Sequence, residues 1–163
     1  MKKILFCTLF TALTAVLSQI IIPIGPVPIN LALISVFTAG GVLGWRGGAS
    51  SQIIFVLLGI VGLPVFAGLH GGIGTLLGPT GGFIMGYIPC AALSGITNRK
   101  WLGMLLGLAI LYIMGSFWYT FITKAHLLAV VITCIIPFIF GDTLKIILSS
   151  ILVKRIGGSY GNK

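Results

Sequence analysis

With 58% hydrophobic and only 7% charged residues and a mean hydropathy of +1.21, this chain of 163 residues cannot bury its apolar side chains in a soluble core. A net charge of +9 does not indicate nucleic-acid binding, because the basic residues are not interleaved with a polar surface. The composition therefore predicts an all-α integral membrane protein. The length allows a single membrane domain, residues 1–163, with about six spans of roughly 20 residues each.

The first expected span covers about residues 4–22, which is too long an apolar run for a cleaved signal peptide. Its small residues form two pairs spaced by four, Thr8 with Ala12 and Thr11 with Ala15, that let another helix approach closely. Internal packing and docking of a partner subunit both remain open for these pairs. The proline-rich segment 23–28 ends the span in a turn at the far membrane face.

Two short spans follow at about residues 30–44 and 49–62, separated by an interfacial Trp-Arg anchor. In the next stretch, 62–82, eight of 21 residues are glycine, and none is charged. Irregular backbone at a membrane is tolerated where it is buried in protein or lines a cavity. We expect an ordered outer loop between helices 3 and 4 whose N–H groups face a ligand; the alternative is a flexible interfacial loop.

The fourth and fifth spans are expected at about residues 82–96 and 101–122. The apolar sequence 125–154 is too long for one comfortable span, and Pro137 and Gly141 offer a break. We expect a short outer helix over residues 126–136 and a sixth span over residues 138–153.

Asp142 is the only acidic residue of the chain, and Lys145 follows it by three positions. In a helix this spacing places both side chains on one face. Ionisable groups at membrane depth are costly and by default mark a functional site, although a structural ion pair between helices is the alternative. Placed in the first turns of the sixth span, the carboxylate is also favoured by the helix dipole.

The basic residues predict the topology. With the N-terminus inside, all but two of them fall on the cytoplasmic side, with Lys124 outside and Lys145 in the membrane. Both termini are then cytoplasmic. The proline-rich turn, the glycine-rich loop and the start of the sixth span share the outer face, which predicts an outward-facing ligand pocket.

The sequence has no GxxxxGK[ST] phosphate loop, no HExxH and no GxSxG motif. His70, His126 and Asp142 do not make a convincing metal site. We therefore predict no enzyme, no metal and no cofactor, and any ATP must be hydrolysed by another protein.

Several stretches nevertheless match a known pattern in order along nearly the whole chain. They are Ile21–Ile29, Gly62–Gly68 (GLPVFAG), Leu77–Gly82 (LGPTGG), Tyr112 with Trp118, and Gly141–Asp142 with Lys145. On these residues the sequence resembles the BioY family, the biotin-specific substrate-binding (S) components of energy-coupling factor (ECF) transporters. It departs from that family at Asn30, Ala32 and Phe83, where Thr, Gln and Tyr are typical.

The resemblance implies a six-helix protein of the cell membrane that captures biotin from outside. A separate transmembrane coupling protein and two cytoplasmic ATPases usually power release inward. The residues implied to contact the coupling protein are the small ones of the first span, Thr8, Thr11, Ala12 and Ala15. The alternatives are a stand-alone carrier or channel that needs no ATPase and, more remotely, an intramembrane enzyme.

The chemistry of biotin fits the candidate residues. Asp142 can accept from a ureido N–H while Lys145 donates to the ureido carbonyl. Flat apolar walls are expected from Phe66, Tyr112 and Trp118. For the biotin carboxylate we expect backbone N–H groups of the glycine-rich loop, helped by Asn30 or His70. The loop residues assigned to the ligand are Gly71, Gly72, Gly78, Thr80 and Gly81.

Overall fold

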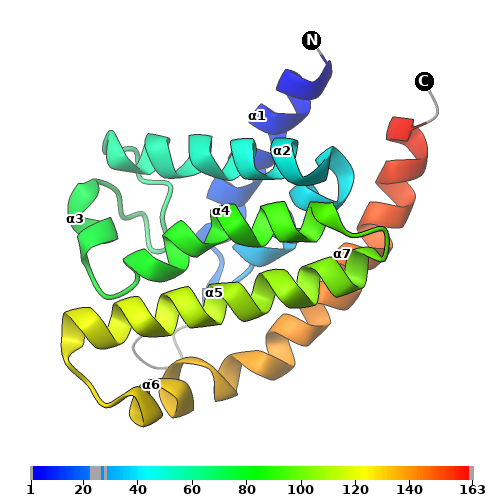
Figure 1. Ribbon diagram of the computed structural model, residues 1–163. Helices are drawn as coiled ribbons and strands as arrows, with labels where there is room; N and C mark the ends of the chain where they lie inside the picture. The colour runs from blue at the N-terminus through cyan, green and yellow to red at the C-terminus, as the bar shows by residue number, and fades with distance from the viewer. Residues whose placement is uncertain (1, 23–26, 28, 162–163) are drawn as a thin grey trace.

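The computed structural model describes residues 2–22, 27 and 29–161, with the side chains of 2, 127 and 158–161 left aside. Within them the chain is mostly helical (Figure 1). The elements are α1 (Lys2–Ser18), β1 (Ile21–Ile22), β2 (Ile29–Asn30), α2 (Ala32–Ile60), α3 (Ile73–Leu77), α4 (Gly81–Ile96), α5 (Lys100–Thr123), α6 (Leu127–Cys134) and α7 (Ile136–Gly161). The expectation of a mainly helical fold is therefore confirmed.

By length and composition, three of the described helices could cross a membrane: α2 when its 29 residues are counted as one helix, α5, and residues 136–157 of α7. The polarity of the molecule fits that setting, because several hydroxyl side chains are buried while many large apolar side chains are exposed. On α1, Thr11, Thr14 and Ser18 are buried, whereas Leu5 and Val16 are more than half exposed. Such an arrangement suits a lipid environment, where buried hydroxyls satisfy one another and the aliphatic surface needs no cover.

Helix α2 consists of two arms that fold back on one another at Gly44. This glycine has φ 76° and ψ 176°, outside the helical region. A Cβ at Gly48 would stand 2.6 Å from the Cα of Gly40, so the arms pack without side chains between them. The first arm (residues 32–43) and the second arm (residues 45–60) correspond to the second and third expected spans, with the loop between them reduced to one residue.

Hydroxyl groups tie α1 to both arms. The Thr14 hydroxyl lies 2.9 Å from the Ser35 hydroxyl on the first arm, and the Gln52 amide on the second arm donates to Thr14 at 3.3 Å. The Thr11 hydroxyl donates to the Ser51 carbonyl at 2.8 Å. These buried bonds fix the rotation of α1 about its own axis.

Helix α4 lies between α2 and α5, and glycines bring the three together (Figure 1). A Cβ at Gly40 would collide with the carbonyl of Ala91 on α4, and one at Gly107 would come within 2.7 Å of the carbonyl of Cys90. Small residues at such crossings let helix backbones approach closely, which is the main source of packing energy where lipid replaces water. The result is a tight α2–α4–α5 layer to which α7 is added.

The end of the first expected span was wrong. The first span does not continue to Ile22: α1 ends at Ser18, and Ile21–Ile22 instead pair antiparallel with Ile29–Asn30. β-branched residues beside a chain reversal favour this ladder over another helical turn. The proline-rich turn itself, apart from Val27, lies outside the described residues.

Between α6 and α7 the break falls at Ile135, just before Pro137 as expected, and α7 passes through Gly141 without interruption.

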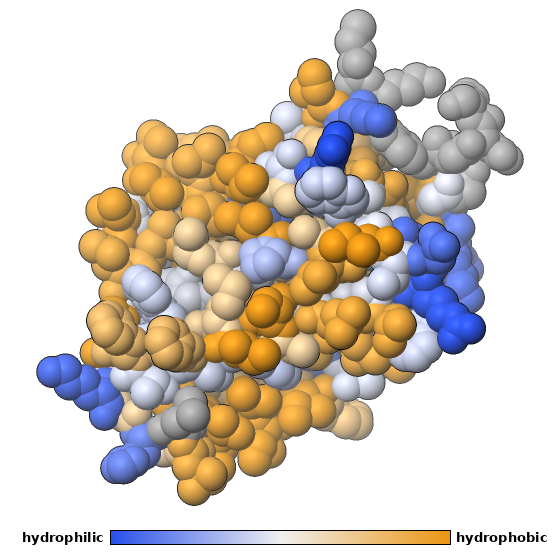
Figure 2. All heavy atoms as spheres, viewed as in Figure 1, coloured by the Kyte–Doolittle hydropathy of each residue, from blue (hydrophilic) through white to orange (hydrophobic). Residues whose placement is uncertain are grey.

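The helices run between two opposite ends of the molecule. At one end the Cys7 thiol reaches the Gly47 carbonyl, and Trp101 and Lys154 line one groove. At the other end Gln19 contacts Val65. Figure 2 shows hydrophilic colours gathered towards the ends and a mainly hydrophobic surface between them, as expected for a molecule surrounded by lipid.

Candidate functional site

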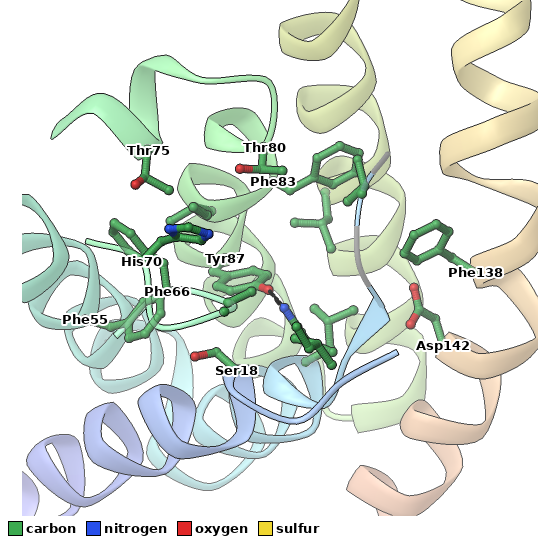
Figure 3. Close-up of a pocket in the computed structure, with 18 of the residues that line it drawn as sticks. Ser18, Phe55, Phe66, His70, Thr75, Thr80, Phe83, Tyr87, Phe138 and Asp142 are labelled. Carbon is green, nitrogen blue, oxygen red and sulfur yellow. Dashed lines mark hydrogen bonds between the residues drawn. The ribbon is translucent and has the colours of Figure 1, made fainter. Parts of the chain in front are cut away.

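A cavity of about 350 Å³ opens among α2, α4, α5, α7 and the chain between α2 and α4. Figure 3 shows Asp142 and Phe138 on one side of it, His70 and Thr75 on the opposite side, and Tyr87 between them. Its lining is mostly apolar, with a few polar groups converging at defined points. This combination is typical of sites for small organic molecules.

The charged end of the cavity is built by α5 and α7. Asp142 and Lys145 are 1% and 5% exposed, and the Lys145 Nζ lies 2.7 Å from Asp142 Oδ1. The Tyr112 hydroxyl donates to the other carboxylate oxygen at 2.7 Å. The expected positions on one helical face are therefore confirmed. Asp142 is held by these two partners and not by the free N–H groups at the start of α7, since it lies almost two turns into that helix.

Aromatic rings form the middle of the cavity. Phe66 is 1% exposed and meets Phe55 edge to face, with ring centroids 5.6 Å apart. The Tyr87 ring is also close to Phe55, with ring centroids 6.2 Å apart. A Cβ at Gly59 would collide with the Phe66 ring, so glycine on α2 creates the space that this ring fills.

A polar pair between β2 and α4 interrupts this aromatic wall. The Asn30 amide nitrogen lies 3.3 Å from the Tyr87 hydroxyl, and the contact is drawn as a dashed line in Figure 3. Asn30 Oδ1 accepts the Ala32 N–H at 3.1 Å, which satisfies one of the N–H groups left without a helical partner at the start of α2. Both side chains can still exchange hydrogen bonds with a ligand.

Comparison with known proteins places this fold and cavity in a family. The model of the BioY family matches residues 1–162. The chain belongs to the BioY family. It is 39% identical to the probable biotin transporter BioY of Pyrococcus horikoshii, with 97% of this chain and 98% of that protein covered. It is 35% identical to the biotin transporter BioY of Thermotoga maritima, with 96% of each covered.

A solved structure agrees with these relatives. The crystal structure at 2.1 Å of the S-component for biotin from an ECF-type ABC transporter superposes on this BioY-family chain with a TM-score of 0.88. The two are 32% identical, and the match covers 95% of this chain and 90% of the other. The resemblance expected from the sequence motifs is therefore confirmed.

Of the predicted ligand residues, seven line the cavity: Asn30, Phe66, His70, Thr80, Tyr112, Asp142 and Lys145. Five do not line it: Gly71, Gly72, Gly78, Gly81 and Trp118. The Trp118 indole instead donates to the Gly78 carbonyl at 3.0 Å and packs against Gly82. Trp118 therefore anchors the end of the loop to α5 without facing the cavity. Gly72 donates its N–H to the Gly59 carbonyl at 2.7 Å, which attaches the loop to α2.

Other lining residues were not predicted from the sequence. They include Ser18, Phe55, Thr75, Phe83, Tyr87 and Phe138. Phe83 and Tyr87 are four residues apart and directly follow the LGPTGG motif, so helical spacing from Thr80 was a usable signal for them. For Phe55 and Phe138 the sequence offers no such signal, because each is one apolar residue among many.

The four residues assigned to a partner differ in exposure. Thr8 and Ala12 face outward on α1, whereas Thr11 is 3% exposed and its hydroxyl is bonded to α2. Ala15 packs against the core from a half-buried position. The spacing by four holds, but only the pair Thr8 and Ala12 presents a free small surface.

Proposed function

We propose that this chain captures biotin from outside the cell and serves its uptake across the cytoplasmic membrane as the substrate-specific subunit of an ECF-type transporter. The observation that carries the proposal is a buried Asp142–Lys145 pair at one end of an apolar cavity, in a fold matched over 95% of the chain by a biotin S-component. Members of this family are transporters and not enzymes, so no catalytic step is assigned to the chain.

The charged end suits the ureido ring of biotin. Lys145 uses one of its three donors on Asp142, and each carboxylate oxygen of Asp142 accepts one bond, so both groups retain capacity. A ureido N–H bonds to the carboxylate while the ureido carbonyl accepts from the ammonium. Both bonds are charge-assisted, and the desolvated surroundings strengthen them.

The remainder of biotin fits the remainder of the cavity. The sulfur ring and the aliphatic tail lie against Phe66, Phe55 and Tyr87, where burial of apolar surface stabilises the complex. The tail carboxylate then reaches the opposite side, where Thr75, Thr80 and His70 face the cavity (Figure 3).

In the membrane we propose six crossings: α1, the two arms of α2, α4, α5 and α7. The Cys7–Gly47 contact and the groove lined by Trp101 and Lys154 support placing most of the basic residues at one, cytoplasmic, end. Both termini then lie inside, and the cavity with its loop lies outside. The short arms of α2 are covered by α1 and α4.

For partners we propose a transmembrane coupling protein and two cytoplasmic ATPases. The supporting feature is the outward face of α1, where Thr8 and Ala12 leave a shallow surface between larger side chains. Small residues at this spacing allow a partner helix to pack closely.

Equilibrium binding of labelled biotin to the purified chain tests the function, with thiamine as the control vitamin. Tight, saturable biotin binding without thiamine binding is expected. Absence of biotin binding would overturn the proposal. Uptake by cells that express the chain without any ATPase partner would support the stand-alone carrier instead.

A further inference from the structure

Gln19, directly after the last residue of α1, holds the chain segment that forms one wall of the cavity. Its side-chain oxygen accepts the Leu69 N–H at 2.9 Å. Its side-chain nitrogen lies 3.1 Å from the carbonyl oxygens of both Val65 and Phe66. One carboxamide therefore bonds to both sides of the same turn, across some 50 positions in sequence.

The turn in question, residues 66–70, is tight. The Phe66 N–H donates to the His70 carbonyl at 3.0 Å, and Gly68 and Leu69 between them have φ of 75° and 60°. Glycine takes such a conformation freely, but Leu69 is strained there because its Cβ crowds the backbone. Leu69 is 69% exposed, so packing of its side chain does not offset that strain. The hydrogen bond from the Leu69 N–H to Gln19 offsets the strain instead.

This 66–70 turn supplies Phe66, Ala67, Gly68 and His70 to the cavity. We propose that Gln19 is a positioning residue: it keeps the 66–70 turn closed against the cavity and thereby slows release of the bound ligand. This inference rests on the proposed function, since it concerns retention of biotin. Gln19 itself does not line the cavity, so it acts through the turn.

The position requires a donor and an acceptor on one planar group. Glutamate provides an acceptor for Leu69 but turns a second acceptor toward the Val65 and Phe66 carbonyls. Alanine provides neither. Ser18 supports the same segment, because its hydroxyl lies 2.5 Å from the Val65 carbonyl, but it makes no bond to Leu69.

The first test measures the turn without any ligand. Hydrogen exchange of peptides covering residues 62–72 is followed in the biotin-free chain in lipid nanodiscs. Gln19→Ala and Gln19→Glu are expected to exchange about tenfold faster there than the parent chain. Val16→Ala, an exposed change on the same helix, is the matched control and is expected to leave exchange unchanged.

The second test measures retention. Dissociation of labelled biotin is expected to be about tenfold faster in both Gln19 variants, since each loses the hydrogen bonds to the Val65 and Phe66 carbonyls. Leu69→Gly added to Gln19→Ala is expected to recover at least about threefold of this loss, since glycine adopts the left-handed conformation without strain. A general loss of stability would not be rescued by that second change.

Faster exchange, faster dissociation and rescue by Leu69→Gly together support the positioning role. Unchanged exchange in the Gln19 variants would overturn it, and so would faster exchange with unchanged dissociation. If the parent chain does not bind biotin, the proposed function fails separately, and the exchange comparison alone decides whether Gln19 holds the turn.

Discussion

At one end of the cavity, two long helices bring Tyr112, Asp142 and Lys145 together; at the other, the wall is the irregular chain between α2 and α4. The helical end uses charged side chains with bonds of 2.7 Å. The loop end uses aromatic rings and backbone, attached to the helices by hydrogen bonds from Gln19, Gly59 and Trp118.

This difference separates two tasks. Interactions between packed helices are rigid and preorganised, so on the proposed function we expect the helical end to provide specific affinity. Loops with few buried contacts open at lower free-energy cost than the helices they connect, so we expect the loop end to control ligand entry and exit. Changes at the helical end should mainly alter equilibrium affinity, and changes at the loop end mainly rates.

The largest effect is expected from Asp142→Asn. It removes a buried negative charge and leaves the Lys145 ammonium without its ion pair, a change that costs several kcal/mol. Biotin affinity should fall at least about 100-fold while the chain still inserts in the membrane. Equilibrium binding measures this, with the exposed neighbour change Thr143→Ala as control. Unaltered affinity in Asp142→Asn would disprove the site.

Tyr112→Phe should follow in magnitude. It deletes only the hydroxyl that donates to Asp142, and hydrogen bonds to charged groups contribute about 1.5–3 kcal/mol, so affinity should fall by about tenfold or more. Tyr119→Phe, on the same helix, is the matched control. Equal effects of the two substitutions would show that the bond to Asp142 is not what matters.

Gly59→Ala tests the loop end. The added methyl group displaces the Phe66 ring from α2, and overpacking of this kind costs about 1 kcal/mol or more. We expect an affinity loss of about fivefold, with most of it in the dissociation rate. Gly74→Ala, where a methyl group meets nothing within 4 Å, should bind biotin normally. A change in the biotin association rate alone would contradict the proposal that Phe66 slows the release of biotin.

The smallest effect is expected from Trp118→Phe. The indole bonds to the Gly78 carbonyl and does not line the cavity, so its loss should weaken binding only about two- to threefold. Trp101→Phe at the opposite end is the control. A 100-fold loss of biotin affinity would instead show that Trp118 contacts the ligand directly, as the sequence predicted.

Much of the fold could be read from the sequence because lipid imposes simple rules. Apolar length predicted where helices lie, and Pro137 marked the start of α7 within a few residues. The i,i+3 spacing of Asp142 and Lys145 predicted their pairing directly, since a helix fixes the direction of both side chains.

Other features needed the structure because they depend on long-range contacts. Trp118 and Tyr112 belong to the same helix and look equivalent in sequence, yet only Tyr112 faces the cavity. Gln19 carries no motif of its own, and its role exists only because residues 65–69 lie beside it. The end of α1 was misplaced because apolar composition does not distinguish a last helical turn from a short strand.

The fold-back of α2 at Gly44 has a consequence for how the protein is made. The whole helix has 29 residues, so neither arm reaches the roughly 20 residues that cross a bilayer unaided. Each arm also carries buried polar groups, such as Ser35 and Gln52, that find partners on α1. We therefore expect the two arms to insert into the membrane together, as a hairpin that packs against an α1 helix already inserted.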